Sequence, residues 1–130
     1  MSTLTSLQTL KSGLMLGESP RWHDGRLSFI DFGAYEVHAV DLSGRDELIA
    51  RLPSMPMGID FLPDGRLLIV PSSDGQVLRR EADGSLTTYA DLSALSRHPW
   101  GDMVVDGRGN AYLGCLGFDF PGGQFAPGIV

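Results

Sequence analysis

The apolar and polar residues of this chain alternate over short stretches, a pattern typical of β-strands that bury one face. Asp-Gly pairs separate many of these stretches and favour tight hairpin turns, because both residue types tolerate positive φ angles. Strands are predicted before the turns at residues 14–16, 58–62 and 102–105, and after them at 27–31, 67–70 and 110–113. Further strands are predicted at 36–41, 76–81 and 85–89. Helical periodicity is nearly absent, and only Asp91 to Ser96 is compatible with a short turn of helix.

The turn motif belongs to a longer repeat. His-Asp-Gly-Arg-Leu at 23–27 returns as Pro-Asp-Gly-Arg-Leu at 63–67 and as Val-Asp-Gly-Arg-Gly at 105–109, so the aspartates lie 40 and 42 residues apart. Units of about 40 residues with four short strands are the signature of β-propeller blades. We therefore predict an all-β fold in which residues 1–130 form part of one propeller domain, with blade units at about 14–54, 55–98 and 99–130. A β-sandwich also has regularly spaced strands, but the repetition of the turns with their flanking residues favours the propeller.

The composition restricts the classes of function. With 130 residues, 42% of them hydrophobic and 20% charged, the chain is expected to form one globular domain. Its net charge of −6 argues against binding to nucleic acid, because an acidic surface repels phosphates. Lys11 is the only lysine, which argues against Schiff-base chemistry. The single Cys115 provides neither an internal disulfide nor a Cys/His cluster for structural zinc.

No targeting or membrane-spanning pattern stands out in the sequence. Residues 1–11 lack a charged segment followed by a continuous apolar one, so no signal peptide is expected. No apolar run reaches the roughly 18 residues that a transmembrane helix needs. The resulting expectation is a cytoplasmic location.

Several short motifs carry a more specific signal. They are Gly-Glu-Ser-Pro-Arg-Trp at 17–22, Val-Asp-Leu-Ser-Gly at 40–44, Pro-Met-Gly-Ile at 56–59, Leu-Pro-Asp-Gly-Arg-Leu-Leu at 62–68, Tyr-Ala-Asp-Leu-Ser at 89–93, Asp-Met-Val-Val-Asp at 102–106 and Gly-Phe-Asp at 117–119. In this order they resemble the regucalcin/gluconolactonase (senescence marker protein-like) family, from about Gly13 to Val130. The resemblance implies a six-bladed β-propeller. At about 40 residues per blade, this chain supplies about three blades, the N-terminal half of the ring.

The resemblance also implies a chemistry. Members of the family mostly hydrolyse sugar lactones or related esters, opening the lactone ring with water activated by one divalent metal ion on the propeller axis, often Ca²⁺ or Zn²⁺. The expected partner is therefore a small-molecule sugar lactone. Three blades leave two open sheet flanks. We therefore expect the C-terminal half to be absent here and to be supplied by a longer parent chain, a complementary chain or a second copy in a homodimer.

Glu18 is the strongest candidate metal ligand. In the motif Gly-Glu-Ser-Pro at 17–20 it occupies the position of the family's metal-binding glutamate, and a carboxylate suits a hard cation. The opposing interpretation is an exposed glutamate at a strand end, the usual place of this residue type. One carboxylate also cannot hold a divalent ion tightly, since such ions take about four to eight donors. The resemblance places the other ligands, an Asn and an Asp, in later blades.

Asp102 and Trp100 are the candidate substrate-binding residues, and Gly101 between them departs from the family pattern. The family usually has Asn-Asp where this chain has Gly101-Asp102, and that Asn reaches the substrate or the metal. Asp102 is placed to act near the axis, but an aspartate that holds a turn at the start of a strand is an equally good interpretation. Trp100 and Trp22 are expected to pack in the core, with a substrate pocket as the alternative for Trp100. No catalytic residue is predicted.

The gaps in the predicted site favour an alternative function. Gly101, and Cys115 where the family often has Asn, are typical of a catalytically inactive propeller fragment, or of a half-propeller that assembles with itself or with a partner chain. A binding module that uses the propeller face is a third hypothesis, which rests on fold analogy alone. The three histidines are predicted to be structural or exposed. The phenylalanines of the loop at 114–128 are expected to form a lid over the channel or a plug between blades.

Overall fold

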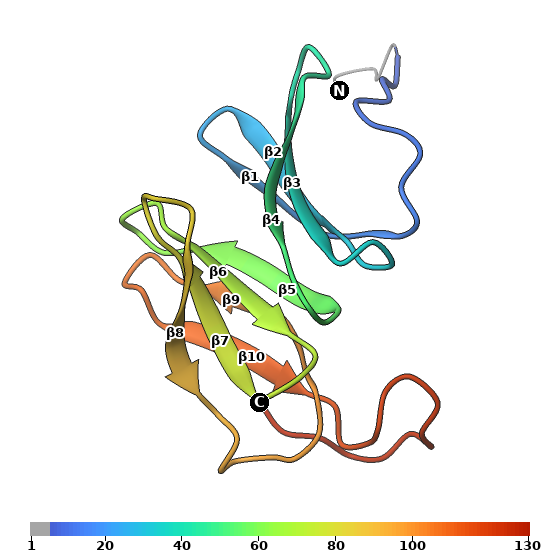
Figure 1. Ribbon diagram of the computed structural model, residues 1–130, viewed down its shortest axis with the longest axis vertical. Helices are drawn as coiled ribbons and strands as arrows, with labels where there is room; N and C mark the ends of the chain where they lie inside the picture. Colours follow the sequence, from blue (N-terminus) through green and yellow to red (C-terminus); the bar gives the residue numbers. More distant parts are fainter. Residues whose placement is uncertain (1–5) are drawn as a thin grey trace, which may run out of the picture.

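The computed structural model describes residues 6–130, and all of its regular elements are antiparallel β-strands (Figure 1). The first five residues of the stretch 1–11, where no signal peptide is expected, lie outside the described residues. The all-β prediction is confirmed. Within residues 6–130 there is no helix long and apolar enough to cross a membrane.

The strands form three sheets in chain order. The first contains β1 (Gly17–His23), β2 (Arg26–Asp31), β3 (Glu36–Asp41) and β4 (Asp46–Arg51). The second contains β5 (Pro56–Phe61), β6 (Leu67–Pro71), β7 (Gln76–Arg80) and β8 (Leu86–Asp91). The third contains β9 (Trp100–Val105) and β10 (Ala111–Cys115). Each strand pairs with the one before it in its own sheet, so every sheet is an antiparallel meander.

Two kinds of turn connect the strands. Asp24 and Gly25 form a two-residue hairpin turn with φ angles of 49° and 75°, as the Asp-Gly pair predicts. The loops at 41–45, 62–66, 81–85 and 106–110 share another geometry, in which the first N–H donates to the fifth carbonyl and the fourth N–H to the first carbonyl. The fourth residue of each loop is a glycine with φ between 83° and 86°. In the third copy of the predicted repeat, the glycine with the positive φ angle is Gly109 and not Gly107 of the Asp-Gly pair. The sequence repeat is therefore out of register with the turn at this place.

Three details of the predicted strands are wrong or incomplete. Residues 14–16 do not form a strand, because Asp31 binds the N–H groups of Met15 and Leu16 and holds this segment beside the sheet. Residues 91–96 contain a turn closed by a bond from the N–H of Leu95 to the carbonyl of Leu92, and no helix. The sequence pattern did not locate β4, whose residues are all half-buried or exposed.

Two apolar clusters join the three sheets. Between the first and second sheets, Ile30, Val37 and Leu52 pack against Ile59, Leu67 and Ile69. On the other face of the second sheet, Leu62, Leu68, Val70 and Val77 pack against Trp100, Met103 and Cys115. Successive residues of β6 therefore enter opposite clusters, as the alternation of side chains along a strand requires. The sheets stack in chain order, as propeller blades do, while the bounds 14–54, 55–98 and 99–130 stay a prediction (Figure 1).

Asp31 is a buried carboxylate at the end of β2. Its side chain accepts the N–H of Met15 at 3.0 Å and that of Leu16 at 3.1 Å. Burial by itself raises the pKa of Asp31, but the bonds from these two N–H groups and from the backbone of Gly33 and Ala34 outweigh it and bring the pKa below 3.8. The negative charge of Asp31 thus fixes the chain that leads into β1.

Asp31 is expected to make the fold sensitive to acid. Because its pKa is lower in the folded state, its stabilisation is present above the unfolded value and is lost as the pH falls through the folded value. Asp31→Asn should lower the free energy of unfolding at neutral pH by about 1–3 kcal/mol, since an amide cannot match the charged acceptor. It should also flatten the loss of stability between about pH 5 and pH 3.

Urea unfolding followed by circular dichroism at each pH measures both effects. Asp24→Asn is the matched control, because Asp24 is exposed in a hairpin turn whose positive φ angle asparagine tolerates. An acid dependence of Asp31→Asn as steep as that of the unmodified chain would contradict the assignment.

Candidate functional site

The first strand of each sheet lies against the first strand of the next. β1 contacts β5, and β5 contacts β9 (Figure 1). The approach of β5 to β9 is close, because a Cβ atom on Gly58 would lie 2.9 Å from the Cα atom of Asp102, and only glycine fits there. The three strands thus bring together side chains that are far apart in the sequence. Glu18, Trp100 and Asp102, the predicted site residues, all lie on two of them.

A β-bulge interrupts β1 next to Glu18. The register shifts between Glu18 and Arg21, and Ser19 has a φ angle of 51°, which is strained for a residue with a side chain. The surroundings hold this conformation, since the buried Ser19 hydroxyl accepts the N–H of Ile59 at 3.1 Å and lies 3.1 Å from Oδ1 of Asp102. The bulge therefore turns Ser19 inward and leaves Glu18 exposed.

Asp102 is held in place by groups from β1 and β9. Its Oδ1 atom accepts hydrogen bonds from the Ser19 hydroxyl, from Nη2 of Arg21 at 3.0 Å and from the N–H of Met103 at 2.8 Å. Nη2 of Arg21 also donates to the carbonyl of Met103 at 2.6 Å. Nε of Arg21 lies 3.7 Å from Oδ1 of Asp60. Within residues 6–130, Oδ2 of Asp102 has no hydrogen-bond donor, and 64% of the side chain is exposed. One oxygen of Asp102 is thus structural and the other is free to bind a ligand.

The sequence interpretation missed Arg21 and Asp60 as members of this cluster. Ser19 was not expected in the cluster either, although its hydroxyl donates to Asp102. A signal was present, because Ser19 and Arg21 are two residues apart on a strand that leads to a propeller axis, and such residues share a face. The strand partners could not be read from the sequence, since Asp102 is 81 residues away from Arg21.

Glu18 has a free carboxylate in the part of the chain that the structure describes. Its recorded contact is a long hydrogen bond, 3.4 Å, from the N–H of Ser19, and it takes part in no ion pair there. It borders a groove of about 350 Å³ whose wall includes Leu27, Phe29 and Val40. Such a carboxylate is available to a cation, and its role as a metal ligand stays a prediction.

The described residues do not complete a metal site. They contain no group of three or more His, Cys, Asp or Glu side chains placed to hold a metal ion. A divalent ion takes about four to eight donors. Glu18 fits the role of one ligand, and a metal site built on it would need donors beyond a cluster of His, Cys, Asp and Glu side chains of residues 6–130.

Trp100 is placed in the core. Its side chain is 5% exposed and packs in the cluster that contains Met103 and Cys115. The indole Nε1 is buried and has no hydrogen-bond partner among the described residues. Packing is thus one role of Trp100, and substrate binding stays a prediction. Trp22, in contrast, is 57% exposed, so its expected place in the core is wrong, because it points out of β1 beside the hairpin turn.

The histidines and the lone cysteine have structural surroundings, as expected. His23 stacks on Phe61 with ring centroids 3.8 Å apart. His38 is buried between two carboxylates, with Nε2 2.9 Å from Glu36 and Nδ1 3.1 Å from Asp46. Hydrogen bonds from His38 and then from Arg51 lower the pKa of Glu36.

The carboxyl-terminal loop gathers its aromatic side chains. Cys115 is buried just before this loop. The ring of Phe118 lies 4.9 Å from that of Phe125 and 6.4 Å from that of Phe120, and Phe120 also meets Phe32 at 6.2 Å. Phe125 is nevertheless 92% exposed, so the cluster is open on one side. Its role as a lid over the channel or a plug between blades stays a prediction.

Comparison with known proteins places these features in a family. A family model described as the SMP-30/Gluconolactonase/LRE-like region matches residues 16–129, which span all ten strands. The chain belongs to this family. A search of curated proteins found no match to the sequence.

Solved structures of this family and of similar folds match the three sheets. A gluconolactonase of Xanthomonas campestris has a TM-score of 0.72 at 17% identity, covering 83% of this chain and 37% of its own. A calcium-binding regucalcin of Agrobacterium tumefaciens has a TM-score of 0.67 at 29% identity, covering 83% and 38%. A virginiamycin B lyase of Staphylococcus aureus has a TM-score of 0.58 at 12% identity, covering 81% and 41%. The SMP-30/gluconolactonase chain thus has the fold of a β-propeller and spans less than half the length of each of these proteins.

Proposed function

We propose that this SMP-30/gluconolactonase-family chain contributes to the metal-dependent hydrolysis of a sugar lactone. The observation that carries the proposal is the exposed Glu18 carboxylate beside a strained bulge on β1, inside the region that matches the family. Strained backbone is concentrated at functional sites because surrounding structure has to maintain it. The similarity to proteins named gluconolactonase and calcium-binding regucalcin supports the substrate class and the kind of ion.

The residues of the cluster have distinct roles in this proposal. Glu18 supplies one carboxylate ligand to a divalent ion, with Ca²⁺ favoured because oxygen ligands suit a hard cation. A bound ion of this kind supplies polarisation of the lactone carbonyl and a more acidic water. The free Oδ2 of Asp102 accepts a hydrogen bond from a hydroxyl of the sugar, while Ser19 and Arg21 fix Asp102 in position. Trp100 supports this strand from the core.

The source of the metal ligands other than Glu18 would decide in which assembly the protein is active. They would come from a longer parent chain, a complementary chain or a second copy, and each of these would also cover the open flank of the first sheet. The groove beside Glu18 on that flank is lined by Leu27, Phe29 and Val40. Residues of the segment 8–14 form the opposite wall, and Phe29 and Val40 are buried, so the groove is open only in part. The part that stays open favours coverage by another sheet.

The alternative is a catalytically inactive propeller piece that assembles with itself or with a partner chain. Gly101, which has no side chain where the resemblance implies an asparagine, favours this alternative. The likeness to a virginiamycin B lyase also shows that one fold serves different reactions. The reaction therefore has to be measured directly.

Metal titration combined with lactone turnover separates the two functions. For the hydrolase we expect calorimetric binding of Ca²⁺ or Zn²⁺, hydrolysis of glucono-lactone, and loss of hydrolysis on addition of EDTA with recovery when metal is restored. Light scattering on the same sample gives the assembly in which activity occurs. Absence of metal binding at millimolar concentration in every assembly of the chain would contradict the hydrolase and leave the inactive alternative.

A further inference from the structure

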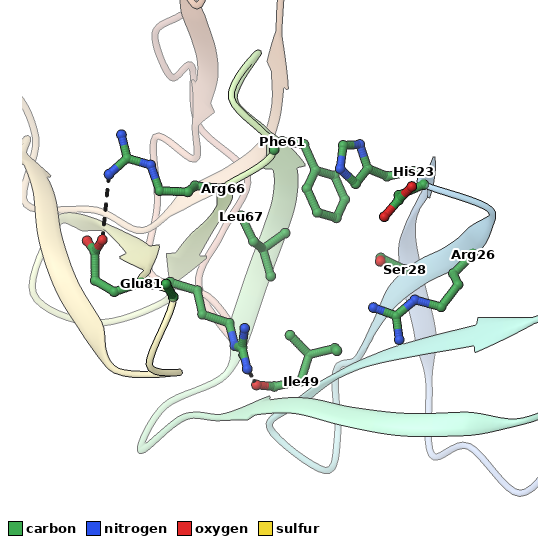
Figure 2. A pocket seen from close by; sticks show the side chains of 12 residues that line it. His23, Arg26, Ser28, Ile49, Phe61, Arg66, Leu67 and Glu81 are labelled. Atoms are coloured by element: carbon green, nitrogen blue, oxygen red, sulfur yellow. Dashed lines mark hydrogen bonds and ion pairs between the residues drawn. The ribbon is translucent and has the colours of Figure 1, made fainter.

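A second pocket lies at the far end of β1 from Glu18. It has a volume of about 260 Å³ and opens between the first and second sheets, beside the Asp24–Gly25 turn (Figure 2). His23, on its wall, follows Glu18 by five residues on the same strand, a separation of about 16 Å along an extended chain. The pocket is therefore distinct from the candidate lactonase site.

Three arginines line this pocket in a chain whose net charge is −6. They are Arg26 at the start of β2, Arg66 before β6 and Arg80 at the end of β7, so two sheets contribute positive charge to one place. Arginine stays charged at every physiological pH and offers five N–H donors in a planar fork that matches carboxylate and phosphate oxygens. Carboxylates are also present on the wall, at Asp24 and Glu81.

Neighbouring carboxylates do not neutralise all of the positive charge of these arginines. Oε1 of Glu81 already accepts bonds from Arg79 and Thr87. Arg26 pairs with Glu47, and Arg66 pairs with Asp64, but these partners are 57% and 50% exposed. Exposed ion pairs of this kind contribute little to stability. Arg26 can thus turn to an anion in the pocket at little cost, whereas Arg66 is held by Asp64 through Nε and Nη2 and lies 3.6 Å from Glu81 through Nη1.

Of the three arginines, Arg80 is the one best placed to bind an anion. Its Nε donates to the backbone carbonyl of Ile49 on the neighbouring sheet at 3.0 Å, which fixes the side chain across the sheet junction. Within residues 6–130, its two Nη groups have no hydrogen-bond acceptor, and Arg80 forms no ion pair. A guanidinium that is anchored by one donor and free at the others is preorganised for an oxyanion.

Part of the remaining wall is aromatic and apolar. The rings of His23 and Phe61 stack with an interplanar angle of 10°, and Leu67 and Ile49 lie across from them (Figure 2). A bare inorganic ion would leave this surface uncovered. A ligand with a ring or an alkyl group would cover it and gain from the removal of apolar surface from water.

We propose that this pocket binds a small organic anion, whose phosphate or carboxylate group pairs with Arg80 and whose apolar part lies on Phe61 and His23. The pocket volume fits a ligand of about the size of one substituted ring. The site would operate independently of the proposed lactonase activity, because it shares no residue with Glu18 or Asp102.

Titration with phenyl phosphate, benzoate, inorganic phosphate and benzyl alcohol tests the proposal. The chain has three histidines, so NMR signals of the imidazole C–H groups report on His23 separately, with His38 and His98 as internal references. We expect saturable shifts at His23 with phenyl phosphate or benzoate, weaker binding of inorganic phosphate, and no binding of benzyl alcohol. The stronger of the two aromatic anions identifies phosphate or carboxylate as the preferred group.

Arg80→Gln should weaken the binding of the preferred anion by about tenfold or more, because it removes a charge-assisted contact. Arg80→Lys keeps the charge but loses the planar fork. Its affinity for the anion should therefore lie between that of the unmodified chain and that of Arg80→Gln. Arg108→Gln is the matched control, since Arg108 is exposed in a loop of the third sheet. Circular dichroism verifies that each variant is folded. Equal affinity in Arg80→Gln and Arg108→Gln, or equal shifts at all three histidines, would overturn the proposal.

Discussion

Replacing Glu18 with glutamine should reduce lactone hydrolysis in the active assembly by about 100-fold or more. The substitution keeps the size of the side chain but removes the negative charge that a divalent ion requires. Even residues that only support metal ligands cost about 10- to 100-fold when they are removed, so loss of a ligand should cost at least as much. Calorimetry should show a matching loss of metal affinity, while the fold stays intact because the Glu18 side chain makes no ion pair among the described residues.

Glu47→Gln is the matched control for this experiment. Glu47 is an exposed glutamate of β4, pairs with Arg26, and lies in a sheet position remote from the first residues of β1. Its replacement should leave both metal affinity and turnover unchanged. Unaltered metal binding in Glu18→Gln would assign the carboxylate to the exposed surface and would remove the main support of the proposed function.

Replacing Ile59 with alanine should lower the free energy of unfolding by about 2–5 kcal/mol. Ile59 is fully buried in the cluster that joins the first and second sheets, where it packs with Ile30 and Ile69. Truncation removes apolar contacts and leaves a cavity that the surrounding strands can close only in part. Because the N–H of Ile59 donates to the Ser19 hydroxyl, a small loss of order at the bulge of β1 is expected as well.

Urea unfolding followed by circular dichroism measures this effect. Leu42→Ala is the control, because Leu42 is 64% exposed in the loop between β3 and β4, and its truncation should change stability by no more than about 0.5 kcal/mol. Equal midpoints for the two variants would show that the sheets do not depend on the shared cluster, and would contradict the stacked arrangement.

Much of the fold was predictable because its local signals agree. Alternating apolar residues predicted most strands, and the Asp24–Gly25 pair predicted the first hairpin turn with its positive φ angles. The spacing of the repeats predicted successive sheets. The pattern failed where local signals were weak or misleading. β4 has no buried residue, the segment at 14–16 is apolar yet unpaired, and Gly107 mimics the turn glycine whose place belongs to Gly109.

The candidate site was predictable only in part. The motif around Glu18 and the position of Asp102 were visible in the sequence, and the structure brings their two strands together. The cluster with Arg21 and Asp60, the strain at Ser19, and the arginine-lined pocket were not foreseen. Each depends on contacts between residues that lie 31 or more positions apart, and no periodicity along one strand reports on them.

The sequence by itself determined the strand-rich class, the hairpin turns and the family, since these follow from local backbone preferences and from short motifs. The tertiary structure decided which carboxylates are engaged and which are free. Asp31 and Asp102 are bound by several backbone and arginine donors, whereas Glu18 has only one long bond, from the N–H of Ser19, among the described residues. The reason is physical: the availability of a charged group depends on the donors that the folded chain places around it, and those donors come from other strands.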